Sequence, residues 1–319
     1  MVQWAQAQRL SADLAMTLHG FLNIHKPAGP TSHDVVARIR RLAGRSARVG
    51  HAGTLDPLAT GVLPVALGHA TRLIEYLAGA RKGYVGLVRL GVTTATDDAE
   101  GAVLATCPLP SLDDAAIEAA VAPLRGAIQQ IPPAYAALHY QGRRLYDLAR
   151  AGVAPDLPPR PVVIYRLDWE RTGPDMLRIV VECGKGAYIR SLARDIGAAL
   201  GCGGHLAALQ RTFVGPFHLA TAIPPDVLSA DPAQLAAALL PPETAIADWP
   251  AAQLDADQAR RVAHGLPVRL PALHGERARA HSPDGALLAV LRHTGDHWQP
   301  EKVFPGSDQA PFGGCTTPE

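Results

Sequence analysis

Two strand-like runs that follow each other closely constrain the fold of this chain more than any other feature. Residues 161–170 (PVVIYRLDWE) and 176–184 (MLRIVVECG) are rich in β-branched and aromatic side chains, and only a turn around TGPD separates them. So short a connection joins antiparallel neighbours, because parallel neighbours need a crossover of a dozen or more residues. Strands that pair in this way beside helices favour an α+β fold, with a mixed and largely antiparallel sheet, over a doubly wound parallel sheet.

Helical segments flank these strands. The segment 31–44 (TSHDVVARIRRLAG) follows a predicted strand at 19–26 and has Thr31 as its expected N-cap, with Asp34 at the capping-box position. Gly44 fits its carboxyl end. Further helices are expected over 111–126, 142–152 and 188–201.

Composition divides the chain into an organised region and several flanking segments. Residues 1–17 carry no motif and are expected to be a disordered extension, or to follow an upstream start codon with Met16 as the functional start. One domain is expected over 18–222, followed by a linker with a helix over 223–250 that is rich in Pro and Ala. Short strands and a Pro-Asp-Gly turn predict a small β-barrel over 251–304, and 305–319 form a disordered tail.

Charge and cysteine content limit the class of protein. The net charge of the 319 residues is only +1, so any basic surface must be local. Four cysteines lie far apart without metal-finger spacing, which predicts reduced thiols in a cytoplasmic protein and no metal. No apolar run reaches membrane-spanning length.

The segment 50–61 (GHAGTLDPLATG) places one carboxylate in a loop that has no other charge. Asp56 is the only acid between Asp34 and Glu75, and a series of arginines precedes it: Arg38, Arg40, Arg41, Arg45 and Arg48. Glycines permit a tight backbone here and Pro57 stiffens it, so the loop can hold a reactive carboxylate at a fixed angle. An ordinary Asp-Pro turn beside a solvated helix face is the alternative.

A second segment concentrates polar side chains just before a predicted helix. GKGAYIR places Lys185, Tyr188 and Arg190 within six residues. The spacing of a phosphate-binding P-loop is absent, and so is a dinucleotide fingerprint. Without further context, this segment could also be a strand end with a snorkelling Lys and Arg.

Together, these segments resemble the TruB-type family of tRNA pseudouridine synthases. The resemblance rests on NIHKPAGPTSHDVV, GHAGTLDPLATG, RKGYVGLVRLG and GKGAYIRSLARDIG in this order, and it runs from about Gly20 to Phe217. PPAYAALHYQGRRLYDLARAG resembles the family's RNA-gripping insertion, at about 126–155, and GCGGHLAALQRT a later motif. The resemblance implies a catalytic domain of pseudouridine synthase type over 18–222 and a PUA-like RNA-binding module over 251–304.

The resemblance also implies the reaction. Members convert the T-loop uridine of tRNA, position 55, to pseudouridine without a metal or organic cofactor. Asp56 matches the family's catalytic aspartate, which attacks the ribose C1′ or the base C6. Tyr84 would stack on the flipped base and is a candidate to take the C5 proton. Arg190 would pair with Asp56 and keep it ionised.

Other matching residues would bind RNA. His51 would fill the space that the flipped base leaves, Tyr188 and Leu209 would line the pocket, and Lys26 would support its wall. Phosphate contacts are expected from three arginines of the insertion: Arg143, Arg144 and Arg150. Two positions depart from the family pattern, because His25 stands where Asp is usual and His139 where Lys is usual. These departures put pocket support and one phosphate contact in doubt, but not the activity.

Two other functions compete with this interpretation. A non-catalytic RNA-binding protein or tRNA-folding helper could use the same scaffold, and a folding role could coexist with catalysis. An Asp-dependent hydrolase would pair Asp56 with Asp97 or Asp98, although TTATDDAEG fits a turn after a strand better. We expect a monomer with no protein partner, because tRNA would cover the basic face. We further expect Asp56 to stand alone, since a second acid would repel RNA and compete for Arg190.

Overall fold

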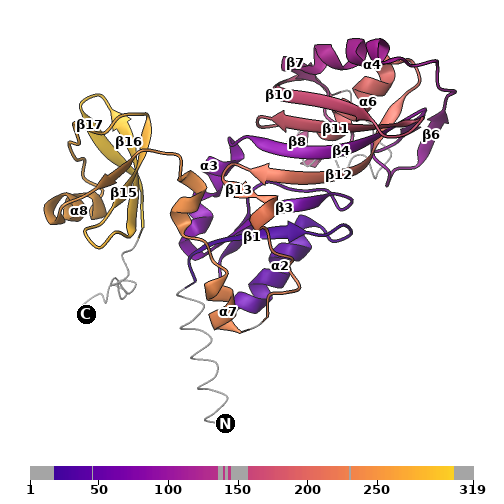
Figure 1. Ribbon diagram of the computed structural model, residues 1–319. Coiled ribbons are helices and arrows are strands. Elements are labelled where there is room, and N and C mark those ends of the chain that lie inside the picture. Colours follow the sequence, from indigo (N-terminus) through magenta and orange to yellow (C-terminus); the bar gives the residue numbers. More distant parts are fainter. Residues whose placement is uncertain are drawn as a thin grey trace, which may run out of the picture. The chain divides into compact units, whose positions relative to one another are not determined.

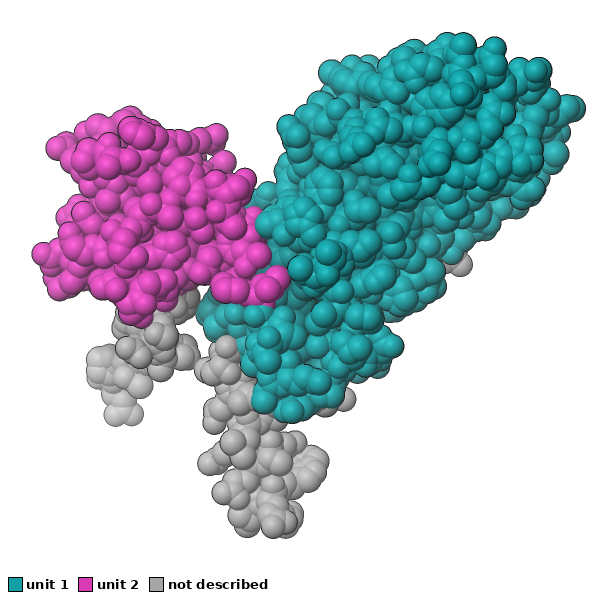
Figure 2. Space-filling view, viewed as in Figure 1, with its two compact units in different colours: residues 1–239 teal, residues 240–319 magenta. Residues whose placement is uncertain are grey.

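The computed structural model divides the chain into two compact units, residues 1–239 and 240–319 (Figure 1, Figure 2). It describes residues 18–44, 46–135, 139–140, 143–144, 157–229 and 231–304. The expected amino-terminal extension and carboxyl-terminal tail lie outside these residues, as does Arg150.

A mixed, largely antiparallel sheet forms the first unit (Figure 1). The strand order is β1-β3-β12-β4-β11-β10-β7, with β2 paired to β3 and β13 to β12. Only the β3–β12 pair is parallel among the described pairs of this sheet. The strands are β1 (Gly20–Lys26), β2 (Val49–His51), β3 (Thr60–Leu67), β4 (Lys82–Leu90), β7 (Gly126–Gln130), β10 (Arg160–Arg171), β11 (Met176–Cys183), β12 (Gly204–Val214) and β13 (Phe217–His218).

The strand pair that predicted this architecture is confirmed. β10 and β11 are antiparallel, with Leu167 opposite Val181. Along β11 every second residue is buried, as the two-residue period of a half-covered strand requires. β11 then pairs with β4, which places Val181 opposite Tyr84.

Helices cover the sheet at two apolar cores. The first core packs α4 (Asp114–Val121) and α6 (Ile189–Ala199) against β4, β10, β11 and β12 (Figure 1). The second packs α2 (Ser32–Ala43) and α7 (Pro232–Ala237) against β1 and β3. The capping box of α2 is present as predicted, between Thr31 and Asp34. The short helical turns that remain in this unit are η1 (Gly68–Leu73), α3 (Ile74–Ala78), η2 (Ala122–Leu124) and η3 (Leu219–Thr221).

Two small antiparallel pairs complete the first unit: β5 (Val92–Thr94) with β6 (Val103–Thr106), and β8 (His139–Tyr140) with β9 (Arg143–Arg144). The basic helix expected over 142–152 is therefore wrong at its start, because Arg143 and Arg144 belong to a strand. The rest of that segment lies outside the described residues.

The second unit contains a four-stranded sheet in the order β14-β15-β16-β17. Its elements are η4 (Pro242–Ile246), β14 (Ala251–Gln253), α8 (Ala256–Ala263), β15 (Arg277–His281), β16 (Leu287–Thr294) and β17 (His297–Val303). The expected barrel is not seen, since no described pair joins β14 to β17. Instead α8 covers the apolar face, and its Val262 shares a core with Leu291 and Trp298.

Within the described residues, no helix has the length and apolar character needed to cross a membrane. No cluster of three or more His, Cys, Asp or Glu side chains there is arranged to hold a metal ion. Among the described residues, Cys107, Cys183 and Cys202 are free thiols.

Candidate active site

The Asp56 loop connects the two apolar cores of the first unit. Val49 before the loop and Leu63 after it belong to the core under α2, whereas Leu55 and Ala59 within it belong to the core under α6. Because β2 and β3 pair antiparallel on either side, the loop must turn tightly. Asp56 thus lies at the junction of both packing layers, with its side chain 36% exposed.

Buried polar side chains hold the backbone of this loop. The hydroxyl of Ser32, the first residue of α2, donates to the carbonyl of Leu55 at 3.0 Å and accepts from its N–H at 2.8 Å. Lys26 is fully buried, and its Nζ donates to the carbonyls of Pro57 at 3.2 Å and Ala59 at 2.8 Å. Burial lowers the pKa of Lys26 to about 8. These contacts tie Lys26 to the backbone of the Asp56 loop, and its support of the pocket wall stays a prediction.

Arg190 meets the Asp56 carboxylate, as predicted. Its Nε lies 3.0 Å from Oδ2 of Asp56, and its side chain is only 6% exposed. Two backbone carbonyls fix the other nitrogens of the guanidinium. Nη1 donates to the Thr96 carbonyl at 3.1 Å, and Nη2 donates to the Tyr135 carbonyl at 3.1 Å. An arginine that is buried and fixed by several hydrogen bonds can orient a carboxylate.

Asp98 shares the same guanidinium, which corrects the expectation that Asp56 stands alone. Oδ2 of Asp98 accepts from Nη1 of Arg190 at 3.3 Å, and the Asp98 side chain is 4% exposed. Asp98 also accepts from the Thr96 hydroxyl and from the N–H of Glu100. The turn predicted at TTATDDAEG is present, and its second aspartate is a buried anchor for Arg190.

The pKa of Asp56 is raised above that of an ordinary aspartate. Burial is the largest cause, and the negative charge of Asp98 adds to it. Arg190 opposes both, followed by Lys26 and Arg211. Arg190 therefore favours the carboxylate, as expected, but does not fully offset its desolvation.

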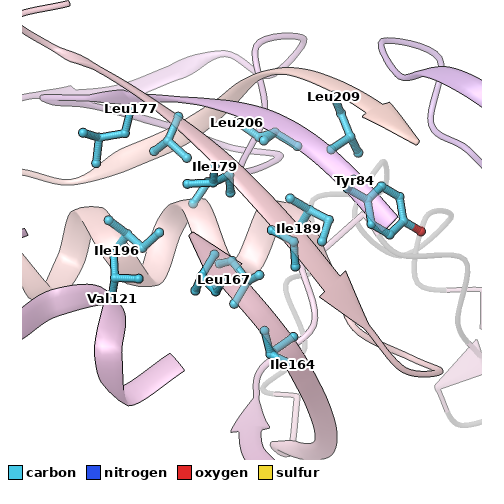
Figure 3. Packing of buried hydrophobic residues seen from close by; sticks show 14 of the residues in the cluster. Tyr84, Val121, Ile164, Leu167, Leu177, Ile179, Ile189, Ile196, Leu206 and Leu209 are labelled. Carbon is cyan, nitrogen blue, oxygen red and sulfur yellow. The ribbon is translucent and has the colours of Figure 1, made fainter. Parts of the chain in front are cut away.

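Tyr84 and Leu209 form an apolar wall beside the loop. Both are 9% exposed and belong to one cluster with Leu55 and Ile189. Figure 3 shows the Tyr84 ring at the edge of this cluster, with its hydroxyl pointing away from the apolar side chains. Burial raises the pKa of Tyr84, so the phenol is protonated at neutral pH. Such a ring face can stack on a base.

Tyr188 and His51 lie on two further elements near the loop. Tyr188 precedes α6 and is half-buried; its N–H donates to Oε1 of Gln130 at 2.8 Å, and Gln130 donates back to its carbonyl. His51 ends β2, and its ring meets the His33 ring edge-on at 5.7 Å. Burial lowers the pKa of His51, so its imidazole is neutral at pH 7.

The side chains of Arg143 and Arg144 are outside the described part of the structure, so their phosphate contacts stay a prediction.

Sequence reasoning missed two buried residues besides Asp98. One is Ser32. The other is Arg211, which donates to the carbonyls of Gly53, Thr54 and Val62 at 3.0, 3.3 and 2.7 Å. The sequence signal for Arg211 was weak, because it lies in the strand-like run GHLAALQRTFV and an arginine is almost never fully buried without a partner.

Comparison with known proteins decides the family. Residues 40–189 match the model described as TruB family pseudouridylate synthase (N terminal domain). The tRNA pseudouridine synthase B of Thermobifida fusca is 46% identical over 298 residues, 90% of this chain and 99% of that protein. The chain belongs to the TruB family of pseudouridylate synthases. The predicted family is confirmed, and with it the enzyme class, an isomerase.

Further matches cover the rest of this TruB-family chain. Residues 190–247 match a tRNA pseudouridylate synthase B C-terminal domain, and residues 249–305 match tRNA Pseudouridine synthase II, C terminal. The tRNA pseudouridine synthase B of a Synechococcus species is 51% identical over 245 residues, 74% of this chain and 80% of that protein.

Solved structures confirm the fold class. A chain from an H/ACA RNP bound to a substrate RNA containing 2′-deoxyuridine matches with a TM-score of 0.68 at 25% identity, over 94% of this chain and 88% of that one. A chain of a Cbf5-Nop10-Gar1 complex matches with a TM-score of 0.68 at 27% identity, over 93% and 88%.

Proposed function

We propose that this enzyme isomerises uridine 55 in the T-loop of tRNA to pseudouridine. The single observation that carries the proposal is the Asp56 carboxylate, fixed at 3.0 Å from Nε of Arg190 and still 36% exposed. The names of its relatives, tRNA pseudouridine synthase B, support tRNA as the substrate.

Asp56 acts as the nucleophile, at the ribose C1′ or at C6 of the base. The bond between N1 and C1′ breaks, the base rotates while still held, and a bond forms between C5 and C1′. The bond between Asp56 and the substrate then breaks, which regenerates the carboxylate. The C5 proton leaves, and N1 of the product carries a proton. Atoms and electrons balance without water or a redox partner, so the residues of this chain suffice as reactants.

The surrounding residues prepare the base for this exchange. The target uridine must leave its stack to reach Asp56, which costs a few kcal/mol in a structured loop. His51 is neutral and fills the vacated space, while the Tyr84 ring stacks on the flipped base. Tyr188 and Leu209 line the pocket, and Tyr84 is the candidate acceptor for the C5 proton.

The remaining parts of the chain serve RNA binding in this proposal. The catalytic domain spans 18–222 with a gripping insertion at about 126–155, and 251–304 form a PUA-like module after the 223–250 linker. Arg143, Arg144 and Arg150 contact phosphates. The enzyme acts as a cytoplasmic monomer, and a tRNA-folding role can accompany catalysis.

A hydrolase that pairs Asp56 with another acid is disfavoured by two contacts. Asp98 is buried against Arg190, and Oδ2 of Asp97 lies 3.0 Å from Nη1 of Arg194. Neither carboxylate is placed to activate a water at the exposed side of Asp56.

Nucleoside analysis tests this function. Unmodified tRNA is incubated with the enzyme, digested completely and separated by chromatography with mass detection. We expect pseudouridine in the digest of unmodified tRNA but not in that of a tRNA with cytidine at position 55, and no free uracil before digestion. Release of free uracil would establish a hydrolase instead.

A further inference from the structure

The arginines that precede the Asp56 loop are not used by the proposed chemistry. Along α2, residues 33, 37, 40 and 41 are exposed, while Val36, Ile39 and Ala43 pack into the core. Arg40 and Arg41 therefore share the solvent face with His33. Arg38 differs, because it is half-buried and its Nε donates to the Pro225 carbonyl at 3.0 Å.

The solvent face of α2 lies beside β2, which leads into the Asp56 loop. Nη2 of Arg40 donates to the carbonyl of Val49 at 2.9 Å, and the His33 and His51 rings meet at 5.7 Å. These two contacts place α2 alongside β2 from one end to the other. At a rise of 1.5 Å per residue, Arg41 lies about 13 Å along the helix from Ser32, which contacts the Asp56 loop.

The positive charge of this surface is not compensated by the described residues. Arg40, Arg41 and Arg48 are exposed, and none of them has an acidic partner within 4.0 Å in the part of the chain that the structure describes. The acid of α2, Asp34, is engaged with Thr31 in the capping box. Burial lowers the pKa of His69, and the charges of Arg72 and Arg48 lower it further.

We propose that Arg40, Arg41 and Arg48 form a phosphate-binding track that carries the substrate RNA backbone away from the active site. This inference rests on the proposed function, because a polyanion docked on a nucleoside-modifying site is the substrate itself. The track lies beside β2 on the far side from His51, since Arg40 contacts Val49 at the start of that strand. Arginines bind phosphates with charge-assisted hydrogen bonds, and each contact releases counterions from the RNA.

Salt-dependent binding tests the track. The double variant Arg41→Gln/Arg48→Gln leaves Arg40 and its bond to Val49 intact. A matched control, Arg89→Gln/Arg178→Gln, removes one exposed and one half-buried arginine, which pair with Asp175 and Glu170. The Kd for unmodified tRNA is measured by filter binding from about 50 to 200 mM salt, the range in which phosphate contacts dominate.

We expect the first variant to lower the slope of log K against log salt by roughly 0.7 to 0.9 per arginine, and the control to keep the wild-type slope. Arg41→Lys/Arg48→Lys should restore most of the slope, because lysine also binds phosphate as a point charge. An unchanged slope in the glutamine variant, or an equal loss of slope in the control, would show that these arginines do not form a phosphate-binding track.

Pseudouridine formation is measured with the same proteins. If the wild-type enzyme makes pseudouridine while the slope is unchanged, only the track fails. If the wild-type enzyme makes none, the proposed function fails, whatever the slope.

Discussion

At the scale of single residues, the site depends on one buried cation that two carboxylates share. Arg190 lies between half-buried Asp56 and fully buried Asp98, at 3.0 and 3.3 Å. Asp98 is therefore a positioning residue, because it fixes the guanidinium that orients the nucleophile. The resemblance predicted the Asp56–Arg190 pair. It did not predict Asp98, which is 92 residues from Arg190 in sequence and lies in a polar turn with no local signal of burial.

Asp98→Asn should lower kcat by about 10- to 100-fold, because a hydrogen bond to a charged group contributes about 1.5–3 kcal/mol. The Kd for tRNA should stay near the wild-type value, since Asp98 is buried and does not face RNA. Single-turnover rates and filter binding measure the two quantities. A wild-type kcat would contradict the positioning role, and an equal rise in Kd would indicate general damage to the fold.

The pH dependence of the rate follows from the raised pKa of Asp56. The nucleophile must be ionised, so activity is lost as pH falls through that pKa, at a higher pH than the 3.8 of an ordinary aspartate. Stability has the opposite sign, because a carboxyl whose pKa is raised by folding favours the fold at low pH and disfavours it when ionised. Single-turnover rates across the acid range check this. A rate constant that stays flat down to pH 3.8 would contradict it.

At the scale of secondary-structure elements, α2 begins where the sequence predicted. The Thr31 side chain accepts from the N–H of Asp34, and Asp34 accepts from the N–H of Thr31. Thr31→Ala should destabilise the fold by about 1 kcal/mol, the usual cost of losing an N-cap. Thr31→Ser keeps the hydroxyl and serves as the control. Denaturant unfolding measures both, and equal stabilities of the two variants would contradict the capping role.

Local patterns predicted elements well and long-range contacts poorly. The β10–β11 hairpin and the helices at α2, α4 and α6 follow from periodicity and caps within single segments. The position of Arg211 under the Asp56 loop follows from the parallel pair of β3 and β12, which are about 150 residues apart and have no local signature of pairing. The prediction of a barrel was wrong because it also depends on a long-range pair. Closure would need β14, a three-residue strand, to pair with β17.

At the scale of the whole molecule, every described residue proposed for catalysis lies in the first unit, and the second unit has a core of its own. A chain that ends at residue 239 should therefore fold and form pseudouridine at saturating tRNA. Its Kd should rise, because the PUA-like module proposed for RNA binding is gone. Loss of the single-turnover rate at saturating tRNA would show that the second unit is required for the chemistry. A wild-type Kd would remove the proposed RNA contact.

Asp56 is the proposed nucleophile, and every later step of the reaction depends on this role. Asp56→Asn keeps the size of the side chain and removes its charge, so turnover should vanish, while tRNA binding should survive or tighten slightly because one negative charge near phosphates is lost. The decisive measurement is tritium release from tRNA labelled at uridine C5, paired with filter binding of the same tRNA. We predict no release above background with unimpaired binding. Substantial release by the pure Asp56→Asn enzyme would show that Asp56 is not the nucleophile.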